Sequence, residues 1–397
     1  MARYTPENCT DIEDIVRDAL QNETPLHITG YGTKTSLGGR VCARDELSLS
    51  AHSGITDYQP EELVLVARSG TPLLEIEETL DKNGQMLAFE PLHLNRFYDQ
   101  PHPGSLGGII ACNLSGSRRI SAGAARDYLL GFDAISGRAG YFRSGSKVMK
   151  NVTGYDLSKL MCGSFGMLAV MSEITLKVLP RPEFMTSLSV TCARLTDAQS
   201  ALSAGFGSAT EPSGGAIIKS GGGFKAVLRL EGVKISVKDR IACLSALLEK
   251  TGTLAVMSAE ESLDFWQMMR DISCLQKGAE QVWKLSVTPS YAPQIIAELE
   301  AGHEVDYALD WAGGLIWLGG RGPELGEAVR NALARHDGGH ATLMRAPEAI
   351  HASQPVFQPL DAALGGLQSR IKTAFDPMYI LNPQKIELAG AADANAL

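Results

Sequence analysis

The sequence lacks several features that would each assign a broad class of protein. No run approaches the roughly 18 apolar residues that span a bilayer, and residues 1–6, MARYTP, lack the apolar core of a signal peptide. There is no basic excess, because the formal net charge is −9, whereas nucleic-acid binding requires a basic footprint. We expect a cytoplasmic protein without a nucleic-acid partner; peripheral association with the inner face of the cell membrane through partner proteins stays open.

Cysteine is present but never in closely spaced pairs. The seven cysteines are dispersed, and their odd number argues against a disulfide framework. None are spaced as Cys-x-x-Cys, so we expect neither an iron–sulfur cluster nor a zinc ribbon in this chain. His336 and His340 are four residues apart, but the Asp-Gly-Gly between them interrupts any helix that would place both rings on one face. The sequence thus predicts no metal site.

A chain of 397 residues is long enough for two domains. We place a domain boundary at residues 180–182, Pro-Arg-Pro, because this run punctuates a predicted strand at 174–179. Beyond the boundary, helix-like and strand-like patterns alternate, which predicts an α+β domain of ferredoxin-like type. Its strands are predicted at 225–230, 254–257, 282–287, 305–309, 315–318 and 341–344.

Residues 28–35, ITGYGTKT, run from a predicted strand into a turn with two glycines. Without Cβ atoms, Gly30 and Gly32 let backbone N–H groups approach an anion closely. Alone, the turn favours an ordinary surface loop over a pyrophosphate cradle. Because Thr35 stands where a third glycine is needed, it is not the Gly-x-Gly-x-x-Gly fingerprint, and no Walker-type loop occurs elsewhere. A nicotinamide-binding Rossmann site is therefore disfavoured.

A second glycine-rich turn, PGSLGG at 103–108, leads into small residues, and two such loops in one domain strengthen each other. They are followed by KNVTGYDL at 150–157 and GSFGMLAV at 163–170, which continues to LKVLP at 176–180. In this order the segments resemble the PCMH-type FAD-binding domain of the vanillyl-alcohol-oxidase superfamily. Residues 114–127, 310–311, 339–343, 375–377 and 381–383 resemble the FAD-binding subunits of bacterial glycolate oxidases.

The resemblance implies a fold in four parts. A two-part PCMH-type FAD-binding domain spans residues 1–182, and an α+β cap domain spans 183–370. A C-terminal segment at 371–388 returns to the flavin, and 389–397 form a disordered tail. The fold class is thus α+β.

The resemblance also implies which residues hold FAD. The two glycine-rich loops wrap the pyrophosphate, the 163–170 segment faces the adenine–ribose half, and Asn382 reaches towards the isoalloxazine. Lys385 is a further candidate. Some relatives bond the flavin covalently to a histidine where this chain has Tyr31, so we expect non-covalent FAD. The implied cofactor-binding residues are Gly30, Tyr31, Gly32, Thr33, Lys34, Ser105, Leu106, Gly107, Gly108, Gly163, Gly166, Val170 and Asn382.

Catalytic residues are not identified by the sequence. Relatives that oxidise D-2-hydroxy acids often carry a His-x-Gly-Asp-Gly-Asn segment in the second domain, and this chain has none. Arg118, Arg119 and Arg126 are either carboxylate-binding or surface charges. Trp311 and Trp317 are expected to be core or interface residues.

The resemblance implies the FAD-binding subunit of a multi-subunit enzyme that oxidises the 2-hydroxy acid glycolate to glyoxylate. Electrons would leave through a separate iron–sulfur subunit, since this chain lacks cluster cysteines, and a second FAD-containing subunit would carry the substrate site. Two alternatives stay open. One is a stand-alone FAD-dependent 2-hydroxy-acid dehydrogenase, and the other is a structural subunit that has kept the fold and lost the flavin.

Overall fold

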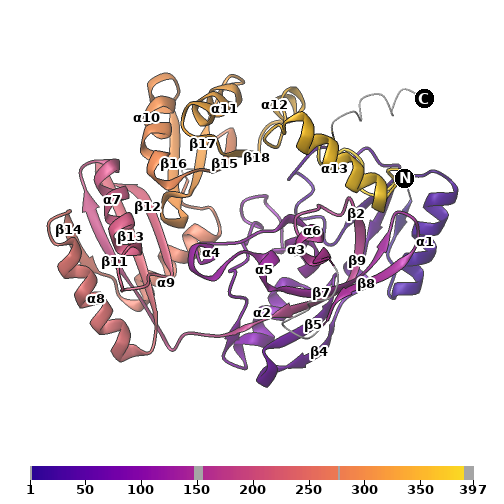
Figure 1. Cartoon of the computed structure of the whole chain (residues 1–397), viewed down its shortest axis with the longest axis horizontal. Coiled ribbons are helices and arrows are strands. Elements are labelled where there is room, and N and C mark those ends of the chain that lie inside the picture. The colour runs from indigo at the N-terminus through magenta and orange to yellow at the C-terminus, as the bar shows by residue number, and fades with distance from the viewer. Residues whose placement is uncertain (1, 147–154, 276–277, 389–397) are drawn as a thin grey trace. The chain divides into compact units, whose positions relative to one another are not determined.

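The computed structural model describes residues 2–146, 155–275 and 278–388 (Figure 1). The chain divides into two compact units: unit 1 comprises residues 1–115, 124–181 and 359–397, and unit 2 comprises 116–123 and 182–358. Two features differ from the sequence-based domain limits. Unit 1 resumes at 359 rather than 371, and the short segment 116–123 belongs to unit 2. The predicted tail at 389–397 lies outside the described residues.

Unit 1 contains a three-stranded parallel sheet of order β1-β3-β2 and a five-stranded antiparallel sheet of order β4-β5-β9-β7-β8. A further antiparallel pair joins β10 to β6. The strands are β1 (Arg3–Tyr4), β2 (Leu26–Thr29), β3 (Asp45–Ser48), β4 (Ile55–Gln59), β5 (Val64–Arg68), β6 (Gln85–Met86), β7 (Leu129–Ser136), β8 (Tyr141–Gly145), β9 (Ala169–Lys177) and β10 (Leu179–Pro180).

The C-terminal segment completes the core of unit 1. Ile12 and Val16 of the first helix pack with Leu26, Ile380 and Leu381, all of them nearly inaccessible to solvent. Leu381 also forms a parallel bridge with Leu26. The helices of this unit are α1 (Cys9–Gln21), α2 (Leu73–Asp81), α3 (Leu106–Cys112), α5 (Ala125–Tyr128), α6 (Leu157–Met161) and α13 (Ala362–Phe375).

A buried ion pair fixes this returning segment. Lys372 on α13 lies 2.5 Å from Asp376, and its Nζ also donates to the carbonyl oxygens of Met167 (2.7 Å) and Leu381 (2.9 Å). The other Asp376 oxygen accepts the Ile380 N–H at 3.1 Å. Because every charge and donor here has a partner, the burial of the pair is compensated.

Unit 2 is an eight-stranded antiparallel sheet of order β14-β11-β13-β12-β16-β17-β15-β18. Each half has the element order β-α-β-β-α-β of a ferredoxin-like unit, and the halves join where β12 pairs with β16. The strands are β11 (Phe184–Cys192), β12 (Gly214–Ser220), β13 (Gly223–Gly232), β14 (Thr253–Val256), β15 (Gln281–Ser286), β16 (Val305–Asp310), β17 (Leu315–Gly320) and β18 (His340–Arg345).

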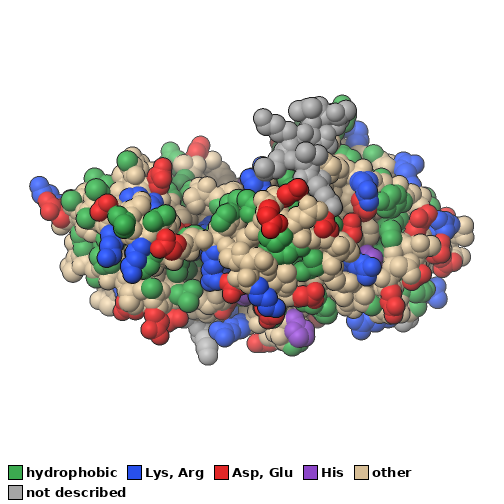
Figure 2. Space-filling view, turned by 90° about the horizontal axis from the view of Figure 1, so that it is seen from below, with side chains coloured by type: hydrophobic (Ala, Val, Ile, Leu, Met, Phe, Trp, Pro, Cys, Tyr) green, Lys and Arg blue, Asp and Glu red, His purple; other side chains and the backbone are tan. Residues whose placement is uncertain are grey.

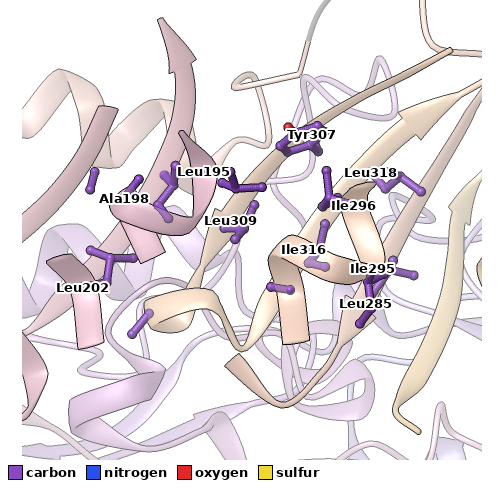
Figure 3. Close-up of a cluster of buried hydrophobic side chains, with 14 of the residues drawn as sticks. Leu195, Ala198, Leu202, Leu285, Ile295, Ile296, Tyr307, Leu309, Ile316 and Leu318 are labelled. Atoms are coloured by element: carbon purple, nitrogen blue, oxygen red, sulfur yellow. The ribbon is translucent and has the colours of Figure 1, made fainter. Parts of the chain in front are cut away.

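Four helices of unit 2 bury an apolar core against one face of this sheet. Figure 3 shows side chains of α7 and α10, such as Leu202 and Ile295, directed towards strand residues such as Leu309 and Ile316. On the opposite face α9 packs on β11, where Trp266 donates to Ser187 at 2.9 Å. The four helices on the core are α7 (Leu195–Phe206), α8 (Lys234–Leu248), α10 (Ala292–Gly302) and α11 (Leu325–Arg335). Unit 2 also contains α4 (Arg119–Ala122), α9 (Ala259–Arg270) and α12 (Glu348–Ser353).

Acidic and basic side chains alternate over the face seen in Figure 2, without a broad patch of one sign. This mixture agrees with a net charge of −9 spread over 45 acidic and 36 basic residues. Among the described residues, no helix is both long enough and apolar enough to cross a bilayer.

Candidate functional site

A pocket opens in unit 1 where its glycine-rich segments converge. The lining comes from the loop after β2, the start of α3, the loop before β9, and two residues of the C-terminal segment. Segments more than 300 residues apart in sequence therefore meet at one site. The predicted residues that line it are Gly30, Tyr31, Gly32, Thr33, Lys34, Ser105, Gly107, Gly108, Gly166, Val170 and Asn382.

The first and second loops touch at positions where a side chain would not fit. A Cβ added to Gly30 would lie 2.2 Å from the Ser105 hydroxyl, and one added to Gly104 would lie 2.3 Å from the Lys34 amine. Gly104 also has a φ of +104°, a conformation that L side chains rarely adopt. These glycines thus bring two polar loops together around a shared space.

Ser105 begins α3 as its N-cap, and its hydroxyl accepts the Gly108 N–H at 3.3 Å. The backbone of the same turn is held by strand β5 and the residues after it, since the Gly107 N–H donates to the Ser69 carbonyl at 2.7 Å. A Cβ on Gly107 would lie 2.8 Å from that of Ser69. The small residues therefore let this turn sit directly on its neighbour.

Two buried lysines place positive charge in the pocket. Lys34 donates to the Pro103 carbonyl at 2.9 Å, and Lys385 donates to the Thr35 carbonyl at 2.8 Å. Burial lowers the pKa of each amine to about 8. The nearby Cys112 thiol opposes this effect for both, while burial raises its own pKa. The pocket therefore favours an anion that would keep both lysines protonated.

The amide of Asn382 fastens two walls of the pocket together. Its Oδ1 accepts the Ile28 N–H at 2.7 Å, and its Nδ2 donates to the Phe165 carbonyl at 2.8 Å. Phe165 and Gly166 both have positive φ values, +53° and +70°, so this turn is held in a strained form. Asn382 thus acts on the site by fixing the turn before β9 against β2.

Two predicted residues lie outside the pocket lining. Leu106, the first residue of α3, is fully buried and belongs to the apolar core. Gly163 has a φ of +91° and shapes the turn after α6, where an added Cβ would contact Asn113 at 3.4 Å. The expected segment at 150–157 falls mostly within 147–154, outside the described residues.

Several lining residues were not among those predicted, although some of them lie inside the quoted glycine-rich segments. Ser69 is buried, and its hydroxyl has no hydrogen-bond partner among the described residues, although it lines the pocket. Lys385 had been only a further candidate. The others are His27, Ile28, Thr29, Thr35, Leu49, Ala111, Cys112, Phe165, Ala169 and Met171.

The FAD binding domain family matches residues 2–144 of this chain. The glycolate oxidase subunit GlcE of Escherichia coli (strain K12) is 36% identical over 372 residues, which cover 94% of this chain and 95% of that protein. This chain belongs to the GlcE family of FAD-binding proteins. Its cofactor is accordingly FAD, as the glycine-rich segments indicated.

More distant members of the same superfamily match only part of the GlcE-type chain. A D-lactate dehydrogenase of Archaeoglobus fulgidus is 29% identical over 49% of this chain and 42% of its own length. The glycolate oxidase subunit GlcD of Bacillus subtilis is 27% identical over 47% of this chain and 38% of its own length. The chain is thus related to an FAD-linked group that includes hydroxy-acid oxidoreductases.

Solved structures share the fold at low sequence identity. An alkyldihydroxyacetonephosphate synthase has a TM-score of 0.70 at 15% identity, over 97% of this chain and 77% of that one. A p-cresol methylhydroxylase has a TM-score of 0.69 at 12% identity, over 96% and 88%. The PCMH-type α+β fold predicted from the sequence is therefore confirmed.

Three observations of this structure fit the FAD that the family implies. Glycines leave space at the loop contacts, two lysines offset the charge of a pyrophosphate, and the Ser69 hydroxyl has an unused donor. Gly-rich backbone and cations are the features that recognise phosphate in proteins. Among the described residues, no three His, Cys, Asp or Glu side chains cluster in a way that would hold a metal ion.

Proposed function

We propose that this chain is the FAD-binding subunit of a multi-subunit enzyme that oxidises glycolate to glyoxylate and passes electrons to an iron–sulfur partner. The observation that carries the proposal is the end-to-end match to a glycolate oxidase subunit together with a pocket whose chemistry suits FAD. The partner requirement rests on the dispersed cysteines, which offer no cluster spacing.

Each wall of the pocket has a separate task in this proposal. Gly30, Ser105 and Gly108 let backbone N–H groups reach the pyrophosphate, while Lys34 and Lys385 offset its charge. When bound, FAD supplies the two-electron oxidation that amino-acid side chains cannot perform. The protein's part is to orient the cofactor and to tune the charge around it.

The flavin is held without a covalent bond in this proposal. Tyr31 stands at the place where some relatives have the bonding histidine, and its ring lies 5.8 Å from that of His102. Acid precipitation tests this point, because non-covalent FAD is released into the supernatant. Flavin that stays in the protein pellet would show a covalent link.

The function is tested by expressing the chain alone and together with a GlcD-like flavoprotein and an iron–sulfur protein. The isolated chain should show a flavin spectrum and no glycolate-dependent dye reduction, whereas the assembled complex should turn over. Robust turnover by the isolated chain would establish a stand-alone dehydrogenase. A chain that neither carries nor binds FAD would be a structural subunit.

A further inference from the structure

A row of polar side chains crosses three strands of unit 2 on the face opposite its apolar core. Lys284 on β15 is paired with Trp317 on β17 and with Thr342 on β18. Directly paired residues point to the same face of a sheet, so these three side chains are neighbours. Their chain neighbours Trp283 and Leu318 belong to the core on the other face.

The Lys284 amine has no acidic partner. Among the described residues, it forms neither a hydrogen bond nor an ion pair, and its one contact is a cation–π approach to Trp311. Burial and, to a smaller extent, the positive charge of Arg119 lower its pKa to about 8. Lys284 is half-buried, so its amine relies on solvent for hydrogen bonds unless a ligand supplies an acceptor.

Two cations meet on the ring of Trp311, the first residue of the 3-10 turn after β16. The Arg119 guanidinium carbon lies 4.2 Å from the ring centroid, and the Lys284 amine lies 5.3 Å from it. The ring is fixed in place because its Nε1 donates to the Gly116 carbonyl at 2.9 Å. The charge of Arg119 lowers the pKa of Lys284, so the two cations repel each other and an anion near both would be favourable.

The carboxylate of the residue before Trp311 accepts two donors. Asp310 accepts the Trp311 backbone N–H at 2.7 Å and the Ser117 hydroxyl at 2.7 Å. It therefore joins segment 116–123 to β16, which positions Arg119 over the ring.

The indole N–H of Trp317 is a second donor that lacks an acceptor among the described residues. Trp317 is only 1% exposed. A buried donor without a partner is uncommon in folded proteins and destabilises them. Lys284 and Trp317 are therefore adjacent donors that lack an acceptor.

We propose that Arg119, Lys284, Trp317 and Thr342 form a binding site for the carboxylate of a small organic acid. Every charged group in the set is a cation, and the Thr342 hydroxyl can also accept a hydrogen bond from the acid's own hydroxyl. β15 is paired on both sides, so its ladder N–H groups are occupied and only side-chain donors remain. A singly charged carboxylate suits that set better than a phosphate dianion, which usually binds backbone N–H groups.

The identity of the acid as a 2-hydroxy acid rests on the proposed function, whereas the carboxylate site itself does not. The two proposals can be refuted separately, because a binding measurement tests the site and a turnover measurement tests the function. Binding without turnover in the assembled complex would overturn the function and leave the site intact.

The test is calorimetric titration of the full FAD-loaded chain with sodium glycolate, sodium acetate and inorganic phosphate at fixed ionic strength. Both carboxylates should bind the unchanged chain, glycolate more tightly than acetate. Lys284→Met should weaken glycolate binding at least tenfold. Trp317→Phe removes the indole N–H together with part of a buried ring, and it should weaken glycolate binding at least fivefold, the loss expected for one hydrogen bond.

Lys219→Met is the matched control. Lys219 also lies over an aromatic ring of this sheet, 4.2 Å from the centroid of Tyr307, but it has an acidic partner in Glu300 at 3.0 Å. Its removal should leave glycolate binding unchanged. Lys284→Met should also raise the melting temperature without ligand, a change that a structural lysine would not give.

Three results would overturn the proposal. The first is no carboxylate binding by the unchanged chain, and the second is equal binding by the chain with Lys284→Met. The third is phosphate binding tighter than that of either carboxylate, which would identify a general anion site.

Discussion

Both units contain lysines that are partly or fully buried, but the amines differ in their hydrogen-bond partners. In unit 1, Lys34, Lys372 and Lys385 each donate to at least one backbone carbonyl, and Lys372 also meets the carboxylate of Asp376. In unit 2, Lys284 has no polar partner among the described residues. The first arrangement holds chain segments in place whether or not a ligand is present, whereas the second leaves a half-buried amine that is available to an anionic ligand.

The largest effect should come from the lysine that is most completely paired. Lys372→Met leaves the buried Asp376 carboxylate without its cation and should lower the free energy of unfolding by about 3–5 kcal/mol. Denaturant unfolding followed by flavin fluorescence measures this loss. Lys82→Met is the control, because Lys82 is exposed and its replacement should change stability by less than about 0.5 kcal/mol. An unchanged free energy of unfolding in Lys372→Met would show that the pair does not stabilise unit 1.

The fit of the glycine loops predicts the next effect. Gly104→Ala combines a φ of +104° with a Cβ only 2.3 Å from the Lys34 amine, and it should reduce FAD affinity more than about 100-fold. Gly54→Ala separates strain from crowding, since Gly54 has a φ of +115° and nothing within 4 Å of an added Cβ. FAD titration of the apoprotein compares the two. Equal losses would mean that backbone strain alone, and not the loop contact, limits binding.

Removal of one pocket charge should have a moderate effect. Lys34→Met deletes a cation that faces the proposed pyrophosphate and should weaken FAD binding about 10- to 100-fold, as expected for a charge-assisted hydrogen bond of about 1.5–3 kcal/mol. Equilibrium dialysis of FAD gives the affinity. Lys34→Arg should recover part of the loss, because it keeps the charge. Full FAD affinity in Lys34→Met would exclude a role for this amine.

The pH dependence is the smallest of these effects when it is counted per lysine. Lys34 and Lys385 have pKa values of about 8 without FAD, so both are charged below pH 8 and lose protons above it. Because an anion binds the protonated form, FAD affinity should be highest below pH 8 and fall about tenfold per lysine between pH 7 and pH 9. Stability without FAD has the opposite sign: lowered lysine pKa values favour the fold as pH rises from 8 towards 10.5. Fluorescence titration at each pH checks the first trend, and Lys34→Met should show a shallower fall.

The cofactor loops could be predicted because a glycine often marks a position where the backbone has no space for a side chain. Gly30 and Gly104 are required by contacts that any side chain would block, and such needs are visible in a short stretch of sequence. Lys385 was harder to place, because its partner Thr35 is 350 residues away in the chain. Ser69 carries no motif at all, and only its unpartnered hydroxyl identifies it.

Local sequence patterns do not determine where the helices of unit 1 begin. Thr10 with Glu13 has the capping-box pattern, yet α1 is capped by Asn8, whose side chain accepts the Asp11 N–H at 2.9 Å. A local pattern does not decide between two adjacent capping residues. The start of α2 likewise has no side-chain cap, and Thr71 instead bonds the Arg68 carbonyl at 2.7 Å.

The doubled architecture of unit 2 was not visible in the sequence. Strand β11 alternates apolar residues with Ser187 and Ser189, which reads as a half-exposed strand, but α9 covers the polar side and both serines are buried. Helix α7 is rich in small residues, so the helical periodicity of its apolar residues is weak. The two ferredoxin-like halves are therefore defined by strand pairing, which is a long-range property.

The order in which the chain is made has a consequence for its flavin. Unit 1 contains residues 1–115 and 124–181 but is completed only by 359–397, after all of unit 2. Asn382 and Lys385, which line the pocket, are among the last described residues to leave a ribosome. Cofactor loading is then an event of the finished polypeptide, and nascent or C-terminally clipped chains would accumulate as colourless apoprotein in a cell rich in FAD.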